Sequence, residues 1–379
     1  EKNMAKKITV IGAGNGGHAL AYDLSLRKAE VLLFEHPDFS KNLEGIKKTG
    51  GIEVIKSLET EGKSVSSKMA GFAKIAQLTT DPKMAMEFSD TIFITVPAFA
   101  QNIMFLKIMP YLKDGQTVIF MPGNFGSLVS HRVMRENDQL AKVNFVEITS
   151  IPYAVRIVAP GQIFILDKKD ELEAASFPSD ALDEKLLNHV EKLLDLKINP
   201  LKNVLASGLS NANMIIHVAT AALGMGPMES REGKMQFYKE GCSKSVAKVL
   251  EEEDKERLKV ANEYGLEIRS FVETVNHFYS LKMKSIRDFT ENSPIHNKMP
   301  ADSPKSPKER YISEDCPYGL VPTYLLGKQA DIDCKTMESI IRICSIYNDE
   351  DYMTAGLTLE KMGLNNMRKD EIIEYIEKR

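Results

Sequence analysis

The first 200 residues alternate short apolar runs with helical stretches. The apolar runs are rich in β-branched residues, as in strands that are covered on both faces of a sheet. This alternation predicts a parallel sheet with crossover helices, and therefore an α/β fold. Residues 153–167 contain two apolar runs around a Pro-Gly pair and predict a hairpin, and a helix is expected at about 181–195. The expected parallel strands are residues 7–11, 30–34, 91–96 and 117–121.

The pattern becomes helical after about Pro200. An uncharged segment, residues 203–228, comes first, and residues 243–265 then form a long amphipathic pattern that closes at a Gly. Prolines between residues 290 and 309 predict an exposed loop. The chain is therefore expected to form two domains, an α/β domain over 1–200 and a helical domain over 201–379. Further helices are expected at 266–280, 335–347 and 369–378.

The uncharged segment 203–228 nevertheless carries Asn211, Asn213, His217 and Thr220. If residues 206–223 form one helix, five positions share one face, within about 80° of each other. Buried polar groups are costly unless they are paired, so this line should face partners or a ligand. The residues leave two interpretations open: His217 is a hydrogen-bonded core histidine, or it is the acid–base group of an active site. The five positions are Ser210, Asn213, His217, Thr220 and Gly224.

Composition excludes several classes of protein. Hydrophobic residues make up 43% and charged residues 27% of the chain, which is typical of a globular protein. A net charge of −4 offers no basic surface for nucleic acid or an anionic membrane. The polar residues of segment 203–228 argue against a membrane span. The four cysteines form no CxxC pair, so free thiols and a cytoplasmic location are expected. The seven histidines are scattered, so no metal site is expected.

A glycine motif follows the first expected strand and opens a helical stretch, which is the context that dinucleotide binding requires. Its three motif glycines allow a tight turn, close approach of the pyrophosphate and close packing of the helix on the sheet. A carboxylate at the end of the second expected strand favours NAD over NADP, because it would repel a 2′-phosphate. The loops 95–102 and 121–128 are expected to line the nicotinamide side, or to be ordinary turns. The expected cofactor residues are Gly12, Gly14, Asn15, Gly16, Gly17, Glu35 and Pro97.

A second polar cluster, RYISEDCPYGLVP, occupies residues 310–322. Arg310 could grip a substrate carboxylate with two parallel hydrogen bonds. Asp315 could hold an imidazole in one tautomer and stabilise its protonated form. A solvated loop of mixed charge is the alternative, and composition alone does not decide between them.

Five stretches resemble the opine dehydrogenases of the octopine/nopaline dehydrogenase family. They lie in the expected order along nearly the whole chain: GAGNGGHALA (12–21), LSNANMIIH (209–217), FYKEGCSKSVAKVLEEEDKERL (237–258), RYISEDCPYGLVP (310–322) and TAGLTLEKMGL (354–364). The resemblance implies a Rossmann domain, a helical C-terminal domain similar to that of 6-phosphogluconate dehydrogenase, and an active site between them.

The resemblance also implies an activity and site residues. The activity is the condensation of an α-keto acid, often pyruvate, with an amino acid, followed by reduction with NAD(P)H. His217 would be the acid–base residue, Asp315 its partner and Arg310 the keto-acid binder. Asn213 and the region 147–156, with Tyr153, would contact substrate. The sequence departs from the family at Asn211-Ala212-Asn213, where Asn-Pro-Asn is usual, and at Val218, where Pro is common.

Two alternatives to an opine dehydrogenase remain. One is a dehydrogenase of the glycerol-3-phosphate or ketopantoate reductase type, but those enzymes typically use a Lys that segment 203–228 lacks. The other is a non-catalytic NAD-binding sensor. The partners expected are small-molecule substrates, with a monomer or homodimer as the oligomeric state.

Overall fold

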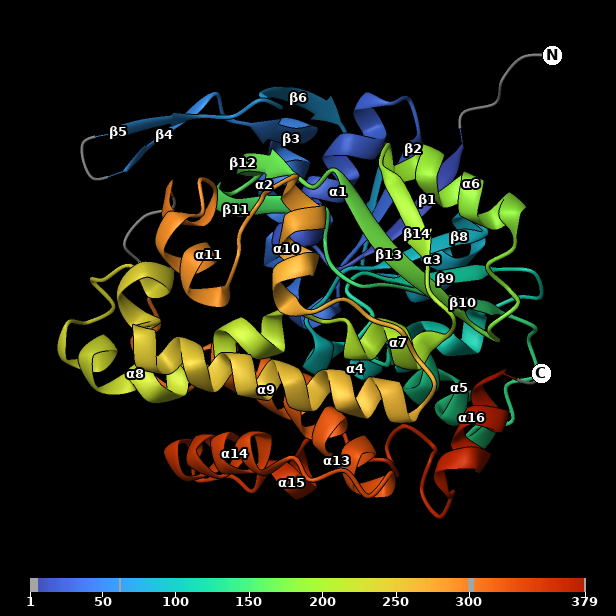
Figure 1. Ribbon diagram of the computed structural model, residues 1–379. Helices are drawn as coiled ribbons and strands as arrows, with labels where there is room; N and C mark the ends of the chain where they lie inside the picture. Colours follow the sequence, from blue (N-terminus) through green and yellow to red (C-terminus); the bar gives the residue numbers. More distant parts are fainter. Residues whose placement is uncertain (1–5, 61–62, 299–302, 378–379) are drawn as a thin grey trace. The chain divides into compact units, whose positions relative to one another are not determined.

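The computed structural model describes residues 6–60, 63–298 and 303–377 (Figure 1). The chain divides into two compact units, the first ending at Val204 and the second beginning at Leu205. The first unit contains all the strands of the described residues, and the described part of the second unit is helical.

An eight-stranded sheet forms the centre of the first unit, and its inner strands are almost entirely buried. Strands β10, β9, β8, β1, β2 and β7 run parallel, while β13 is antiparallel to β10. The four parallel strands expected from the sequence are confirmed. In sheet order the strands are β14 (Lys197–Pro200), β13 (Glu171–Phe177), β10 (Asn144–Ile148), β9 (Thr117–Phe120), β8 (Thr91–Ile94), β1 (Lys7–Ile11), β2 (Glu30–Phe34) and β7 (Gln77–Thr79).

The order of the strands reverses beside β1. The chain passes from β1 to β2 and β7 on one side, and then places β8 and β9 on the other side. Val10 is level with Leu33 of β2 and with Phe93 of β8, so these three strands end at the same edge. Open α/β sheets bind their ligands at such a switch point, outside the carboxyl ends of the strands. The glycine loop leaves β1 at this position.

A smaller sheet lies beside helix α1 (Asn15–Leu26). The expected hairpin is confirmed as β11 (Tyr153–Ala159) and β12 (Gln162–Lys168), which pair antiparallel. Strand β12 continues the sheet through β3 (Gly51–Val54) to β6 (Gly71–Lys74), and β4 (Ser57–Thr60) pairs separately with β5 (Lys63–Ser66). The other helices of this unit are α2 (Lys41–Thr49), α3 (Pro82–Phe88), α4 (Ala98–Ile108), α5 (Gly126–Glu136) and α6 (Glu184–Leu194).

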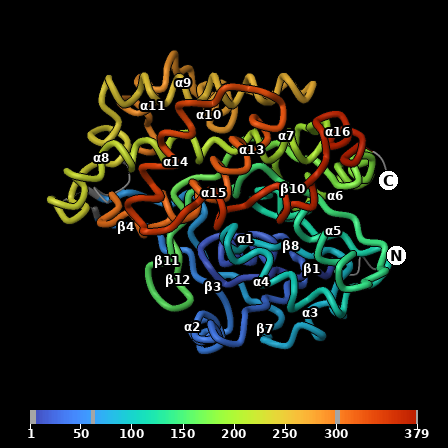
Figure 2. The backbone as a smooth tube through the Cα atoms, turned by 90° about the horizontal axis from the view of Figure 1, so that it is seen from below, coloured from blue at the N-terminus to red at the C-terminus, as the bar shows by residue number. Residues whose placement is uncertain are grey.

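The second unit is built around the long helix α9 (Lys244–Glu263), which contacts α8, α11, α13 and α14 (Figure 2). Its start is capped by Ser243, whose hydroxyl accepts a hydrogen bond from the backbone of Val246 at 3.3 Å. No helix in the described ranges combines the length and hydropathy that crossing a membrane would need. The remaining helices are α7 (Val204–Leu209), α8 (Ala219–Ser230), α10 (Phe271–Tyr279), α11 (Ile286–Asn292), α12 (Arg310–Ser313), α13 (Val321–Gln329), α14 (Lys335–Asn348), α15 (Tyr352–Ala355) and α16 (Lys369–Glu377).

The single helix expected over 206–223 is wrong. Helix α7 ends at Leu209, residues 210–213 connect it to a π-helical turn at Met214–Val218, and α8 follows. The Asn211 side chain accepts a hydrogen bond from the backbone of Asn213 at 3.0 Å. Such local bonds compete with helical ones, which explains why the helix breaks there.

The expected loop 290–309 is nearly correct for the described residues. Helix α11 extends to Asn292, and a short 3₁₀ turn covers His296–Lys298. Residues 299–302 of this loop lie outside the described residues.

Helix α9 also buries a carboxyl group that lacks a partner. Glu253 is completely buried, and neither of its side-chain oxygens has a hydrogen-bond partner among the described residues. Burial raises the pKa of Glu253 well above its ordinary value, and the nearby Cys344, Glu256 and Asp254 add to this rise. Burial therefore favours the protonated, uncharged form of Glu253.

Glu253→Gln should stabilise the protein more at pH 8 than at pH 4.5. The folded protein keeps the Glu253 proton at pH values where the unfolded chain has lost it, so the stability of the wild type falls as pH rises above about 4.3. Glutamine has no proton to lose. Urea unfolding of both proteins at the two pH values measures the difference, and a difference that does not grow with pH would contradict the account. Glu252→Gln, on the exposed side of the same helix, is the control.

Candidate active site

Three π-helical turns lie in the second unit, at Met214–Val218, Phe237–Gly241 and Cys316–Leu320. Such turns are rare and are found frequently at functional sites. Each turn contributes one polar side chain to a single cluster, either from the turn itself or from the residue next to it. His217 lies on the first turn and Tyr238 on the second, while Asp315 directly precedes the third.

The centre of the cluster is a hydrogen bond between His217 and Asp315. His217 Nδ1 lies 2.9 Å from Asp315 Oδ2, although the residues are 98 positions apart. The two side chains are only 12% and 13% exposed. The Tyr238 hydroxyl lies 3.3 Å from the other ring nitrogen, Nε2. A carboxylate at Nδ1 fixes the orientation of an imidazole and makes Nε2 the nitrogen that exchanges protons with a ligand.

Aromatic rings enclose the imidazole of His217. The ring of Tyr311 lies 4.3 Å from it, centre to centre, and the ring of Phe237 lies 5.9 Å away in an edge-on arrangement. Phe237 in turn stacks on Tyr311 at 4.5 Å. Such surroundings exclude water and strengthen the interaction between imidazole and carboxylate. Sequence reasoning did not assign Tyr238, Phe237 or Tyr311 to the site, although all three lie in stretches that carry the family resemblance.

The first and third π-helical turns are packed directly against each other. A Cβ atom at Gly319 would lie 2.8 Å from Met214 Cβ, so the contact requires glycine. The Thr323 hydroxyl lies 3.4 Å from the Met214 sulfur. Met214 is three residues before His217, and Gly319 is four residues after Asp315. Close packing of these turns therefore brings the two members of the pair together.

The residues of the predicted polar line differ in their exposure. Ser210 and Thr220 are buried, and Asn213 is exposed at the start of the His217 turn. The break at residues 210–213 and the wider π-helical turn change the register, so the five positions do not share the one face that regular helical spacing predicts. Only His217 of this set is hydrogen-bonded to the predicted carboxylate.

Arg310 begins the short helix α12 and directly precedes Tyr311, whose ring covers His217. Its side chain is 64% exposed, and its Nε donates a hydrogen bond to Glu314 Oε2 at 2.5 Å. Glu314 is itself buried. The ion pair with Glu314 orients the guanidinium of Arg310 from one side. Arg310 is also the direct neighbour of Tyr311, which packs on the imidazole.

In the first unit, the glycine loop has the geometry of a phosphate cradle. Gly12 has a φ of +97°, and a Cβ at Gly17 would lie 1.7 Å from the carbonyl oxygen of Gly12. Both positions therefore require glycine. A Cβ at Gly14 would meet no atom within 4 Å, so the space above this residue is open. Helix α1 begins at Asn15, and its amino end faces this space with a positive dipole.

Side chains at the ends of β2 and β8 complete the cradle. Glu35 directly follows β2 and accepts hydrogen bonds from the backbone of Ala13 at 2.9 Å and from the Asn42 amide at 3.0 Å. Thr95 directly follows β8, and its hydroxyl donates to the carbonyl of Ile11 at 2.9 Å. Pro97 caps the start of α4. The predicted cofactor residues thus lie at the edge of the sheet where its order reverses.

Two residues of the region 147–156, Glu147 and Tyr153, are buried and hydrogen-bonded. Glu147 is completely buried and accepts hydrogen bonds from the backbone of Ser127 at 3.0 Å and of Phe125 at 3.2 Å. Burial raises its pKa to about 7, while the bonds from Ser127 and Phe125 act in the opposite direction. Tyr153, expected to contact substrate, is buried and donates its hydroxyl to Asp23 at 2.6 Å. This bond holds the hairpin on α1, and the contact of Tyr153 with substrate stays a prediction.

A Rossmann-type unit with a glycine cradle and a helical unit with a His–Asp pair together define a two-part nicotinamide-dependent dehydrogenase. Comparisons with known proteins narrow this class. Residues 200–348 match the family model of the alpha-helical domain of NAD/NADP octopine/nopaline dehydrogenase. Residues 7–136 match the N-terminus of NAD-dependent glycerol-3-phosphate dehydrogenase. Over residues 200–348 the chain is therefore similar to the octopine/nopaline dehydrogenase family.

Individual relatives cover nearly the whole chain. The opine dehydrogenase of Arthrobacter sp. (strain 1C) is 29% identical over 98% of this chain and 99% of its own length. Two solved structures share the fold. An octopine dehydrogenase in complex with NADH and agmatine has a TM-score of 0.76 at 20% identity, covering 99% of each chain. A yersinopine dehydrogenase with NADP+ bound has a TM-score of 0.68 at 15% identity, covering 98% of each chain.

Proposed function

We propose that the protein is an opine dehydrogenase, which joins an α-keto acid to the amino group of an amino acid and reduces the product with NAD(P)H. The observation that carries this proposal is the His217–Asp315 hydrogen bond in a helical unit that matches the family model. The balanced reaction consumes the keto acid, the amino acid, NAD(P)H and one proton, and releases the opine, NAD(P)+ and water.

The glycine cradle fits the nicotinamide cofactor. The open space above Gly14 admits a pyrophosphate, and the carboxylate of Glu35 suits the ribose hydroxyls of NAD. Asn42 and the backbone of Ala13 hold that carboxylate in place. NADP would place a second negative group near Glu35, so NAD is the preferred form. When bound, the cofactor supplies the hydride that reduces the carbon–nitrogen double bond.

His217 is the proposed acid–base residue. The amine adds to the keto carbon, and the resulting hydroxyl must leave as water before reduction. Protonated Nε2 of His217 donates to that hydroxyl, and Asp315 stabilises the positive imidazolium during the step. The Tyr238 hydroxyl lies 3.3 Å from Nε2, where it can donate a proton to this nitrogen or accept one from it. The enclosing rings of Phe237 and Tyr311 limit the access of water to a hydrolysable intermediate.

Arg310 is the proposed binder of the keto-acid carboxylate. Glu314 occupies the Nε position, which leaves the outer edge of the guanidinium to face a ligand. Asn213, exposed four residues before His217, is a proposed second polar contact. Arg310 directly precedes Tyr311, whose ring packs on His217. Asn213 directly precedes the π-helical turn that carries His217.

Oxidation of NADH should require a keto acid and an amino acid together. Purified protein, NADH and pyruvate are mixed with single amino acids from a panel, and absorbance at the nicotinamide band is followed. The secondary amine should appear in equal amount to the NADH consumed. Oxidation with pyruvate alone would point to a hydroxy-acid dehydrogenase, and cofactor binding without oxidation under any mixture would point to a sensor.

Arg310→Lys should raise the KM for the keto acid by about tenfold or more, because an ammonium cannot make the two parallel bonds of a guanidinium. The KM for the amino acid should change little. Arg342→Lys, an exposed change on α14 of the same unit, is the matched control. An unchanged keto-acid KM in Arg310→Lys would remove this residue from the site.

A further inference from the structure

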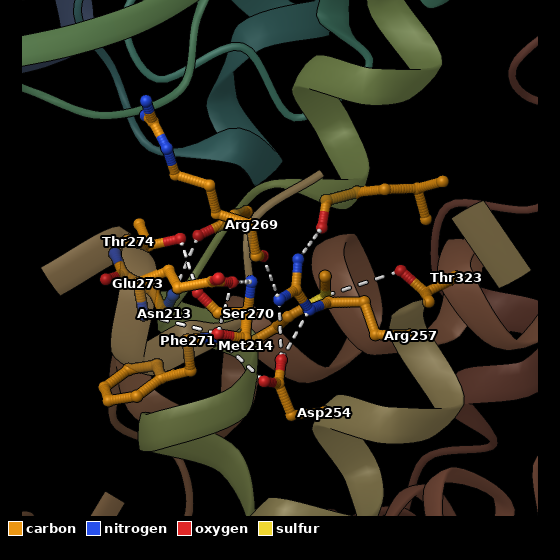
Figure 3. A network of polar contacts seen from close by, with 12 residues as sticks. Asn213, Met214, Asp254, Arg257, Arg269, Ser270, Phe271, Glu273, Thr274 and Thr323 are labelled. Atoms are coloured by element: carbon orange, nitrogen blue, oxygen red, sulfur yellow. Dashed lines mark hydrogen bonds and ion pairs between the residues drawn. The ribbon is translucent and has the colours of Figure 1, made fainter. Parts of the chain in front are cut away.

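Helix α9 buries the guanidinium of Arg257 (Figure 3). Arg257 has no exposed surface, and its charge is balanced by Asp254, one turn earlier on the same helix. Asp254 Oδ1 accepts hydrogen bonds from Arg257 Nε at 2.9 Å and from Nη2 at 2.6 Å. The other carboxylate oxygen accepts from the backbone of Phe271 at 2.8 Å. The pair is thus held in one geometry on both sides.

The remaining donors of Arg257 reach two backbone carbonyls outside α9. Nη1 donates to Leu209 at 2.7 Å, and Nη2 donates to Arg269 at 2.8 Å (Figure 3). Leu209 is the last residue of α7, where helical carbonyls have no partner within the helix. A cation at this end also complements the helix dipole. The guanidinium therefore marks the point at which α7 stops and the connection to the His217 turn begins.

The segment between Leu209 and His217 is consequently fixed at two points. Arg257 holds its beginning, and the contact of Met214 with Gly319 and Thr323 holds it three residues before His217. The residues that contact Met214 lie shortly after Asp315, on the third π-helical turn and on α13. A shift of the first point would therefore move His217 relative to Asp315, because His217 lies only eight positions after Leu209.

A buried ion pair of this kind is an inefficient way to gain stability. Removing two charges from water is costly, and apolar side chains of similar volume often stabilise a core as well or better. A guanidinium does provide directional bonds to several oxygens at once, which an apolar side chain cannot. This property suits a residue whose task is to hold a broken helix in one arrangement.

We propose that Arg257, oriented by Asp254, is a positioning residue for catalysis, which sets the distance between His217 and Asp315 by holding the carbonyl of Leu209. This inference rests on the proposed acid–base role of His217. Arg257 touches no substrate in this account and acts only through the segment that carries the imidazole.

Arg257→Lys tests the inference, because lysine keeps the charge but cannot reach Asp254 and both carbonyls together. The kcat should fall by about 100-fold, as expected for a misplacement of about 1 Å. The KM for the keto acid and the affinity for NADH should stay unchanged. The pH profile of kcat should also shift, because the hydrogen bond between the His217 imidazole and Asp315 would be distorted.

Glu256→Gln is the matched control for a loss of stability. Glu256 is the neighbouring buried residue on α9, but its carboxylate accepts hydrogen bonds from the start of α14, at Thr336 and Met337, at 2.8 and 2.9 Å. Urea unfolding should show both variants to be destabilised, while kcat and its pH profile change only in Arg257→Lys. Equal effects of the two variants on kcat would overturn the inference.

Two further variants separate the possible failures. If Arg257→Lys does not accumulate as folded protein, Asp254→Asn tests the same contact, and a normal kcat in that variant would overturn the inference. His217→Ala tests the underlying function. Near-normal turnover in His217→Ala would refute the acid–base role itself. Loss of turnover in His217→Ala with a normal kcat in Arg257→Lys would refute only the role of Arg257.

Discussion

The hydrogen bond between His217 and Asp315 joins two segments that are 98 residues apart, and the helical unit is arranged so that this bond can form. Neither side chain lies on a regular helix. Each lies on or beside a π-helical turn, and the two turns interlock through Met214 and Gly319. A turn of this kind inserts one residue into a helix and so redirects the side chains that follow. The unusual backbone is therefore the means by which two distant side chains meet.

Helix α9 carries several buried polar residues within five positions, and two of them support this arrangement. Arg257 binds the end of α7, Glu256 caps α14, and Glu253 is a buried acid whose oxygens have no hydrogen-bond partner among the described residues. Buried polar groups in natural proteins are normally satisfied. Arg257 and Glu256 have their partners at the ends of other helices. The backbone groups at those ends have no partner within their own helix, so α9 holds these helices in place by bonding to them.

Patterns that depend on neighbouring residues were predictable from the sequence. The four parallel strands, the hairpin, the amphipathic helix α9 and the glycine motif all follow from local periodicity or turn chemistry. The break after Leu209 was missed, because a search for helical spacing assumes a constant period. The local bond from Asn213 to Asn211, and above all the distant Arg257, end the helix there. Tyr238 and Tyr311 were missed because only the folded chain brings them to His217.

The surroundings of Tyr153 were not predictable from the sequence, because its partner is far away in the chain. Its hydroxyl is bonded to Asp23, and nothing in the local pattern YAVR reveals that partner. The pairing of Asp315 with His217 was expected from the resemblance alone, and it is present in the structure at 2.9 Å.

In the proposed mechanism His217 and Asp315 act as one unit, and a double-mutant cycle on kcat tests this directly. His217→Ala, Asp315→Asn and the double variant are compared with the wild type, with NADH affinity as the check on integrity. Residues that act together are strongly non-additive, so the double variant should be about as slow as His217→Ala alone. Losses that multiply, so that the double variant falls far below either single variant, would contradict the account.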